Sequence, residues 1–359
     1  MVYLCTISIC PTYNPDFTPK VIRRTPRTRK YNTIEGEKVQ YVIGIDGGGT
    51  KTRGVLSLLT GEVIADVTVG PSNYQLIGSN KAQKTFQALL EALTGNINKA
   101  DIKFIYFGLS GADLPSDFET IYQFLSPLVG DIPHLVENDT WCVFRSALQQ
   151  QWGVVSLYGT GSNAGAVELN GKKHILRALG YATGGFGGGD EIAMTALHYA
   201  FRADEGTYKQ TSLSTLIPSM LVLESMTDVV DYVYPTFKIS EKVFKLLPPV
   251  VFEEAGKGDS VCIEILTNFG KTQGEMVKGM LTKAKLTNHQ VPVVLGGSVY
   301  KGSTPHFLDA MMKTIKEVAP DAYAVKPELP PVAGSVLYAL EKSNTAVTNE
   351  TYDFLQTLI

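Results

Sequence analysis

The sequence predicts an α/β protein with two domains, and three observations support this. The chain has 359 residues, more than one ordinary hydrophobic core organises, so two domains are expected. Segments with strand character alternate with amphipathic helical segments in both halves, which favours layered sheets covered by helices. One arrangement of strand, glycine turn, strand, tight turn and strand also occurs twice. Duplication of one unit is the simplest explanation of that repeat.

The overall composition disfavours several classes of protein. The chain is 44% hydrophobic with a net charge of -3, so no strong field attracts nucleic acid or an anionic membrane. No apolar run reaches the roughly 20 residues of a membrane helix. The cysteines lack CxxC spacing, which argues against a zinc site and a disulfide framework. We therefore expect a cytoplasmic protein that binds neither nucleic acid nor membrane. The four cysteines are Cys5, Cys10, Cys142 and Cys262.

Residues 1–40 are expected to form a disordered basic extension. Within them, residues 20–30 read KVIRRTPRTRK, which is basic and interrupted by proline. The apolar start is short and contains polar breaks, so it matches a signal peptide poorly. An arm that contacts nucleic acid or lipid is the alternative. Folded structure is expected to begin near Tyr41, with one domain over 41–152 and a second, carrying a helical insertion, over 153–359.

The first copy of the repeat contains a glycine turn between strands. Residues 41–46 read as a buried strand, the glycines follow, and TRGVLSLL continues as a second strand before EVIADVTV. Glycines let backbone N–H groups approach an anion closely. Because a strand follows the turn, it is neither a Walker A loop nor a dinucleotide-binding turn. We interpret it as a β-hairpin phosphate loop, with a plain tight turn as the alternative. Three side chains could add donors to it: Thr50, Lys51 and Thr52.

The second copy spans residues 153–176, GVVSLYGTGSNAGAVELNGKKHIL. A strand leads into Gly159-Thr160-Gly161-Ser162, and the strand AGAVEL follows. The pair Asn170-Gly171 predicts a type I′ turn before a third strand. Two such hairpins facing each other would bind a polyphosphate from both sides.

Periodicity predicts the elements between the two copies. Residues 79–97 repeat apolar side chains at spacings of three and four, which predicts a helix that ends at Gly95. Residues 104–111 and 134–139 are short and apolar enough to be buried strands.

The elements after the second copy are mainly helical. Residues 189–201 open a helix, and 211–290 are helical with breaks at Pro235 and Pro248-Pro249. The segment VPVVLGGSV predicts a buried strand that ends in a glycine pair, and VAGSVLYALEK predicts a closing helix.

Two aspartates that follow strands suggest phosphoryl transfer. Asp46 lies beside the first glycine turn, where a carboxylate is unfavourable unless a cation such as Mg²⁺ bridges it to phosphate through water. Asp139, between a strand and a helix, is a candidate general base for a hydroxyl that attacks phosphate. The alternatives are a turn-forming role for Asp46 and a helix N-cap role for Asp139. Asn138 and Glu137 rank lower as the base.

Six short motifs occur in one order along the chain: IGIDGGGTKT (43–52), NYQLIG (73–78), GLSGAD (108–113), VEND (136–139), LYGTGSN (157–163) and VVLGGSV (293–299). This order resembles the BadF/BadG/BcrA/BcrD ATPase family of the actin–hexokinase–Hsp70 superfamily. Within that family, the chain is most similar to the N-acetylglucosamine kinases, over about residues 41–340. The resemblance implies an actin-like ATPase fold of two ribonuclease-H-like domains, with ATP and Mg²⁺ in an interdomain cleft.

The resemblance also implies roles for single residues. Asp139 matches the catalytic base, and Asp46 faces Mg²⁺ through water. The residues implied in ATP binding are Gly47, Gly48, Gly49, Thr50, Lys51, Thr52, Gly159, Thr160, Gly161, Gly296, Gly297 and Ser298. The residues implied in substrate binding are Asn73, Tyr74, Asp113, Ser162 and Asn163.

One segment departs from the amino-sugar kinases, in which a pattern like GWGxLLGDEGS follows the second hairpin. Here residues 180–197 read GYATGGFGGGDEIAMTAL, which keeps Gly189-Asp190-Glu191 but lacks the tryptophan and the Gly-Ser pair. This difference weakens the expectation of N-acetylglucosamine specificity more than it weakens the expectation that the protein uses ATP. A flexible loop that ends in a helix cap is the alternative reading of GGFGGGDE.

We therefore expect an ATP-dependent kinase that phosphorylates a sugar or amino sugar, with an N-acetylglucosamine-like acceptor first. Domain closure would exclude water from the reaction. The alternative is a nucleotide-gated ATPase that acts as a regulatory or activator protein without phosphorylating a sugar. An iron–sulfur activator is disfavoured because Cys142 and Cys262 are isolated. The sequence does not decide the sugar, the hydroxyl or the oligomeric state, for which a homodimer is one option.

Overall fold

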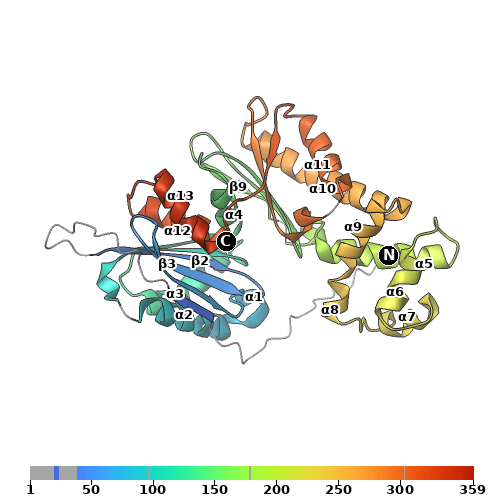
Figure 1. Cartoon of the computed structure of the whole chain (residues 1–359), viewed down its shortest axis with the longest axis horizontal. Coiled ribbons are helices and arrows are strands. Elements are labelled where there is room, and N and C mark those ends of the chain that lie inside the picture. The colour runs from blue at the N-terminus through green and yellow to red at the C-terminus, as the bar shows by residue number, and fades with distance from the viewer. Residues whose placement is uncertain (1–19, 24–38, 96, 178, 303) are drawn as a thin grey trace. The chain divides into compact units, whose positions relative to one another are not determined.

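The computed structural model describes residues 20–23, 39–95, 97–177, 179–302 and 304–359, which form two compact units (Figure 1). The second unit is Gln150–Lys326, and the first combines the described residues up to Gln149 with Pro327–Ile359. The sequence assigns residues 327–359 to the second domain, whereas in the structure this segment packs in the first unit.

The first unit is built on a six-stranded sheet in the order β1-β4-β3-β2-β5-β6. The strands β2, β3 and β4 pair antiparallel as the predicted meander, and β5 and β6 extend it in parallel with β2. The hairpin pairs Gly47 with Thr52, so residues 48–51 form the turn. The strands are β1 (Lys20–Arg23), β2 (Tyr41–Gly47), β3 (Thr52–Leu58), β4 (Val63–Val69), β5 (Ile102–Leu109) and β6 (His134–Asn138).

Strand β1 differs from the disordered extension expected over residues 1–40. Lys20–Arg23 pair antiparallel with β4 at the edge of the sheet. Two β-branched residues in the centre of KVIR favour a strand. The rest of the predicted extension, residues 1–19 and 24–38, lies outside the described residues.

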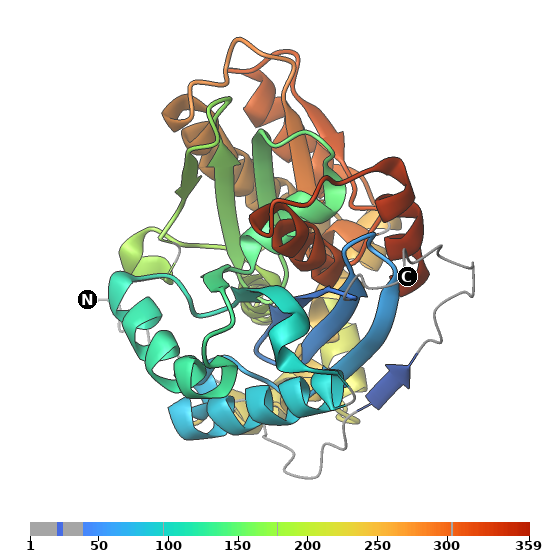
Figure 2. The ribbon, with the colours of Figure 1, turned by 90° about the vertical axis from the view of Figure 1, so that its left-hand side faces the viewer.

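Helices cover both faces of the first sheet (Figure 2). Ile43 and Ile45 of β2 share a core with Phe86 of α2. Alternation along β2 turns Gly44 to the opposite face, where a Cβ atom would lie only 2.4 Å from the Val336 nitrogen of α12. Helix α12 therefore packs backbone to backbone on β2, which explains why residues 327–359 belong to this unit. The helices are α1 (Tyr74–Ile77), α2 (Ser79–Thr94), η1 (Lys99–Asp101), α3 (Pro115–Val129), α4 (Thr140–Ala147), α12 (Pro331–Lys342), α13 (Asn349–Leu355) and η4 (Gln356–Leu358).

The second unit repeats the same plan on a five-stranded sheet in the order β11-β10-β7-β8-β9. The strands β7, β8 and β9 form the second antiparallel meander, and β10 and β11 extend it in parallel with β7. The repeat predicted from the sequence is thus present in both units. The strands are β7 (Gly153–Tyr158), β8 (Ser162–Val167), β9 (Lys173–Ile175), β10 (Pro292–Gly296) and β11 (Tyr323–Val325).

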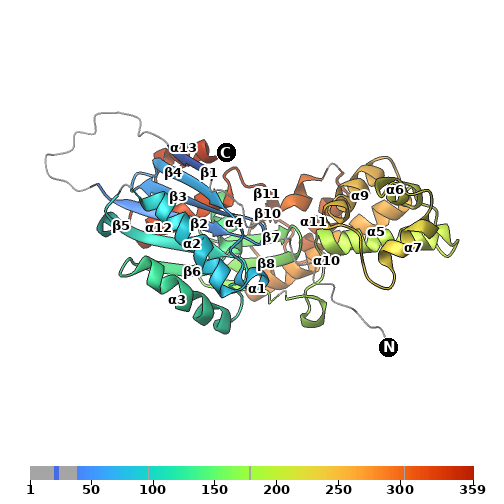
Figure 3. The ribbon, with the colours of Figure 1, turned by 90° about the horizontal axis from the view of Figure 1, so that it is seen from below.

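The second unit carries a helical region beside its sheet. In Figure 3, α5, α6, α7 and α9 gather at one end of this unit. The helix break expected at Pro248-Pro249 is present, because α8 ends at Phe244 and α9 begins at Leu247. The two prolines lie in the first turn of α9, where proline is tolerated because no intrahelical N–H is needed. None of the helices in the described ranges is long and apolar enough to cross a membrane. The helices are η2 (Tyr181–Thr183), α5 (Gly189–Asp204), α6 (Leu213–Met220), α7 (Met226–Val233), α8 (Glu241–Phe244), α9 (Leu247–Gly256), α10 (Ser260–Lys283), η3 (Ser298–Lys301) and α11 (His306–Lys316).

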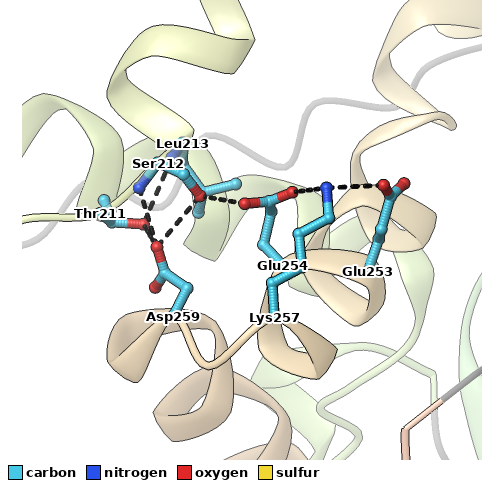
Figure 4. Close-up of polar contacts among 7 residues, drawn as sticks. All are labelled: Thr211, Ser212, Leu213, Glu253, Glu254, Lys257 and Asp259. Atoms are coloured by element: carbon cyan, nitrogen blue, oxygen red, sulfur yellow. Dashed lines mark hydrogen bonds and ion pairs between the residues drawn. The ribbon is translucent and has the colours of Figure 1, made fainter.

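A polar network fixes α9 and α10 to the start of α6 (Figure 4). Asp259 caps α10, because one carboxylate oxygen accepts from the Val261 N–H at 2.9 Å. Its other oxygen accepts from the Ser212 N–H and from the Thr211 hydroxyl, each at 2.8 Å. The Ser212 hydroxyl donates to Glu254 of α9 at 2.6 Å. The C-terminal half of α9 is thus held in place by charge-assisted hydrogen bonds.

Helices α10 and α11 pack closely through glycines. A Cβ atom at Gly270 would lie 2.2 Å from the Phe307 carbonyl oxygen, and one at Gly274 would lie 2.7 Å from the Thr314 Cβ. These contacts leave no room for a methyl group on that face of α10.

The first prediction compares two glycines of α10. Gly270→Ala should lower the free energy of unfolding by about 1–3 kcal/mol, because the methyl group overpacks the α10–α11 contact. Gly279→Ala is the matched control, since no described atom lies within 4 Å of its Cβ position, and it should raise helix stability by up to about 1 kcal/mol. Urea unfolding of the full chain measures both changes. Equal stability of the two variants would contradict the packing.

Candidate active site

The predicted catalytic residues lie at the carboxyl ends of the parallel strands β2, β5 and β6. The register places Gly47 beside Leu109, and Leu109 beside Asn138. The Asp139 N–H donates to the Leu109 carbonyl at 3.3 Å. Asp46, the glycine turn and Asp139 therefore meet at one edge of the first sheet. Ligands of α/β proteins bind at such edges.

The glycine turn after β2 connects two antiparallel strands, so the predicted β-hairpin is present. The Gly48 N–H donates to the Lys51 carbonyl at 3.0 Å, and the Gly48 carbonyl accepts from the Ser72 N–H at 3.1 Å. Thr50 and Lys51 are exposed, whereas Thr52 is buried at the start of β3. Thr50 and Lys51 can reach a ligand in solution, and the Thr52 hydroxyl points into the unit with no partner among the described atoms.

Asp139 occupies the N-cap position of α4, but its side chain makes no capping hydrogen bond. The side-chain oxygen of Asn138 accepts from the Thr140 N–H instead, at 3.0 Å. The alternative capping role predicted for Asp139 therefore belongs to Asn138. The Asp139 carboxyl is left available for chemistry.

The electrostatic surroundings of Asp139 suit a general base. Burial of its carboxyl group, together with the nearby carboxylates Asp46 and Asp113, raises the pKa of Asp139 to about 7. The residue itself is only half-buried, so a substrate can reach it. A carboxyl whose pKa lies near neutral pH can accept a proton and release it again under working conditions.

Asp46 has a similar environment. Burial raises the pKa of its carboxyl to about 6, while the cations Lys51 and Arg53 act in the opposite direction. Arg53 is itself paired with Asp66 at 2.7 Å. A buried carboxylate with so little compensation is expected to attract a cation.

The neighbours of Asp139 are engaged elsewhere. The Asn138 side-chain amide donates to Asp113 at 2.8 Å, and the Tyr106 hydroxyl donates to Glu137 at 2.7 Å. Burial raises the pKa of Asp113 to about 6. Asn138 and Glu137, the lower-ranked candidates for the base, thus take part in side-chain hydrogen bonds within the unit.

The predicted substrate residues of the first unit lie next to this edge. The Asn73 side-chain oxygen accepts from the Gln75 N–H at 3.0 Å, and its amide donates to the Ser110 hydroxyl at 3.3 Å. The Tyr74 hydroxyl donates to Asp117, which engages its polar group within the unit. Both side chains are therefore held by hydrogen bonds within the first unit.

Two glycine turns of the second unit also lie side by side. Strand β10 runs parallel to β7 and pairs Gly296 with Leu157. Gly297 has a φ of 107°, and a Cβ atom there would lie 2.3 Å from the Tyr158 carbonyl oxygen. Only glycine permits this approach of the β10 end to the β7–β8 turn.

A cavity of about 460 Å³ opens beside these turns. This volume lies in the range of small-molecule sites. The α9 residues give it an apolar wall, and two lysines contribute positive charge. The sequence analysis did not assign the α9 residues to a site, because their approach to the glycine turns depends on the folding of distant segments. The lining residues are Gly159, Thr160, Gly189, Asp190, Lys245, Pro248, Pro249, Phe252, Ser298, Val299, Lys301 and Gly302.

The predicted substrate residues of the second unit begin strand β8. The Ser162 hydroxyl donates to the Phe186 carbonyl at 3.4 Å, and Gln273 donates to the Asn163 carbonyl at 3.1 Å. Both residues are half-buried. Ser162 therefore links the start of β8 to the segment in which the sequence departs from the amino-sugar kinases, whereas Asn163 contacts α10.

The second prediction tests the raised pKa of Asp139 through stability. Because the folded-state pKa of about 7 exceeds the ordinary 3.8, the folded state binds more protons, and the wild type loses stability as the pH rises between these values. Asp139→Asn removes this loss. In urea unfolding, the variant should be more stable than the wild type at pH 8, with a smaller advantage at pH 5.

The control for that comparison is Asp131→Asn, which removes one carboxylate from an exposed turn. An advantage of Asp139→Asn that is the same at both pH values would contradict the assignment.

Comparison with known proteins places the chain among phosphoryl-transferring relatives. It is 27% identical over 314 residues to an N-acetyl-D-glucosamine kinase of Dictyostelium discoideum, covering 84% of this chain and 98% of that protein. It is 28% identical over 265 residues to an N-acetylmuramic acid/N-acetylglucosamine kinase of Clostridium acetobutylicum, covering 73% of this chain and 86% of that protein.

Solved structures show the same fold. A putative N-acetylglucosamine kinase of Chromobacterium violaceum superposes with a TM-score of 0.58 at 19% identity, covering 83% of this chain and 98% of that one. This likeness confirms the predicted fold class. The BadF/BadG/BcrA/BcrD ATPase family pattern matches residues 43–339. Since that match spans most of the sequence, the chain belongs to the BadF/BadG/BcrA/BcrD ATPase family.

Proposed function

We propose that the protein is an ATP-dependent kinase that transfers the γ-phosphoryl group of ATP to a hydroxyl group of an amino sugar of the N-acetylglucosamine type. One observation carries the proposal. The Asp139 carboxyl lies at the carboxyl edge of parallel strands, makes no capping bond and has its pKa raised by burial to about 7. The family and the amino-sugar kinases among the relatives support the same activity.

The nucleotide is assigned to the cavity of the second unit. The apolar wall from Pro248 and Phe252 suits the adenine ring, and the turn at residues 159–161 suits the phosphates. We propose the glycine turn at residues 47–49 of the first unit as a second phosphate-binding turn. Both turns present backbone N–H groups, which bind phosphate without the cost of ordering a long side chain.

Asp139 is assigned the proton transfer. As the sugar hydroxyl oxygen forms its bond to the γ-phosphorus, the bond from that phosphorus to the bridging oxygen breaks and ADP leaves. The hydroxyl proton moves to the Asp139 carboxylate. Most of the rate enhancement in such reactions comes from positioning and from neutralising charge, and the general base adds to it.

The residues present fit a magnesium ion that is held mainly by phosphates. Among the described residues, no group of three acidic, histidine or cysteine side chains could form a complete metal site. Mg²⁺ usually keeps several waters and binds through one or two carboxylates together with substrate phosphates. The buried Asp46 carboxylate would hold such an ion. When bound, Mg²⁺ neutralises negative charge on the phosphates.

The third prediction concerns catalysis by Asp139. Asp139→Asn should lower kcat by about 10²-fold or more, because the asparagine amide cannot accept the proton. The affinity for an ATP analogue should stay close to that of the wild type. Asp131→Asn, with the same chemical change on an exposed turn, should retain full activity. Wild-type kcat in Asp139→Asn would remove Asp139 from this role.

The fourth prediction concerns the acceptor. ADP release should be stimulated by one member of a panel that contains N-acetylglucosamine, N-acetylmuramic acid, glucosamine and glucose, and the phosphorylated sugar should be detected by mass spectrometry. Excluding water favours transfer to the sugar over hydrolysis. Slow ATP hydrolysis that no sugar stimulates would contradict the kinase and favour a nucleotide-gated regulatory ATPase.

A further inference from the structure

The segment that departs from the amino-sugar kinases is in direct contact with the β7–β8 turn. Gly187 and Gly188 are buried, whereas Gly184 in the same segment is exposed. We infer that Gly187–Gly189 and the first turn of α5 position the β7–β8 turn so that its backbone N–H groups bind the phosphates of the nucleotide. This inference rests on the proposed function, since it deepens the phosphate assignment. The alternative reading of GGFGGGDE as a flexible loop does not account for the buried contacts.

Gly188 makes the closest contact. Its φ is 132°, a conformation that favours glycine. A Cβ atom at this position would lie 2.2 Å from the Thr160 carbonyl oxygen and 2.6 Å from the Gly161 Cα. Any larger residue must therefore push the turn away or move α5.

The first turn of α5 holds the carbonyl groups of the turn. The Gly189 N–H donates to the Gly159 carbonyl at 2.7 Å, and the Asp190 N–H donates to the Thr160 carbonyl at 3.3 Å. The first N–H groups of a helix have no partner within the helix and carry its partial positive charge. Here two of these groups are satisfied by carbonyl groups of the turn.

This arrangement sets the direction of the remaining amides. In a planar trans peptide the N–H points opposite to the C=O. Since the carbonyls of Gly159 and Thr160 face α5, the N–H groups of Thr160 and Gly161 point away from it. Within the described residues neither N–H has a hydrogen-bond acceptor, and both residues are exposed. Two adjacent free amides of this kind form a concave site for an anion.

Polarisation strengthens these two donors. A peptide group whose carbonyl accepts a hydrogen bond becomes a better N–H donor. The positive end of α5 therefore acts on the phosphates through the turn, without contacting them. Burial raises the pKa of the Asp190 carboxyl, while the nearby Lys245 acts in the opposite direction.

The turn is held from its other flank as well. A Cβ atom at Gly297 would lie 2.9 Å from the Gly159 nitrogen, and one at Gly187 would lie 2.7 Å from the Tyr158 hydroxyl oxygen. The β7–β8 turn is thus confined between the end of β10 and the start of α5. A displacement at either flank changes the direction of its amides.

The test separates phosphate binding from adenosine binding. Titration calorimetry of the full chain with Mg²⁺ compares a non-hydrolysable ATP analogue with adenosine. Gly188→Ala should weaken the ATP analogue by about 10–100-fold, the equivalent of losing one or two charge-assisted hydrogen bonds, and should leave the affinity for adenosine unchanged. Gly184→Ala is the matched control, because it also has a positive φ of 87° but no described atom within 4 Å of the Cβ position. It should bind both ligands like the wild type.

A second variant covers the case in which Gly188→Ala does not fold. Gly189→Ala would place its Cβ 3.3 Å from the Gly159 carbonyl oxygen, so it should cause a smaller loss of ATP affinity in the same direction. Unchanged ATP affinity in the folded variants would overturn the inference. Equal losses for ATP and adenosine would overturn it too, since they would show a purely structural role.

The wild type tests the proposed function separately. If it binds the ATP analogue more tightly than adenosine but phosphorylates no sugar, the kinase proposal fails and the variant comparison still decides the inference. If the wild type binds the ATP analogue and adenosine with equal affinity, the turn does not contribute to binding the phosphates. The inference then fails, even if the protein is an active kinase.

Discussion

Close contact between backbone segments, at positions where no side chain fits, is the constraint on which the rest of the structure depends. In the first unit, a Cβ atom at Gly44 would lie 2.4 Å from the Val336 nitrogen, and one at Gly334 would lie 2.0 Å from the Cys142 carbonyl oxygen. These contacts fix α12 between β2 and α4. In the second unit, Gly188 and Gly297 confine the β7–β8 turn from two sides. Packing at this distance fixes the orientation of the peptide groups and keeps the loops from adopting other conformations.

Close backbone packing positions different chemical groups in the two units. In the second unit it orients amide groups beside a cavity with an apolar wall. In the first unit it packs the elements around the ends of β2, β5 and β6, where three carboxyl groups lie in protein surroundings with raised pKa values. Transfer of a phosphoryl group to a hydroxyl requires groups that stabilise negative charge and a group that accepts a proton near neutral pH. In the proposed function, the amides bind the nucleotide phosphates and the Asp139 carboxyl accepts the proton of the acceptor hydroxyl.

Much of this could be predicted from the sequence because the signals are local. Glycine turns between alternating strands identify both meanders, and the order of the motifs identifies the family, which the family match confirms. The position of Asp139 after β6 also follows from its neighbours in the chain. The sequence does not reveal that Asp139 makes no capping hydrogen bond, since this depends on the Asn138 side chain, which accepts from the Thr140 N–H.

What the sequence could not predict depends on contacts between distant segments. The return of residues 327–359 to the first unit follows from the packing of α12 on β2, and the pairing of Lys20–Arg23 with β4 follows from an open sheet edge. The role inferred for Gly188 has the same origin. A run of glycines suggests flexibility until the structure shows what lies against it.

The most direct measurement of the central claim is the NMR chemical shift of two backbone amides in ¹⁵N-labelled protein. Adding the ATP analogue with Mg²⁺ should shift the Thr160 and Gly161 amide signals downfield, as expected for N–H groups that donate to phosphate, and adenosine should leave them in place. If the ATP analogue binds and these two signals do not respond, or if adenosine moves them equally, the turn does not hold the phosphates and the account is contradicted.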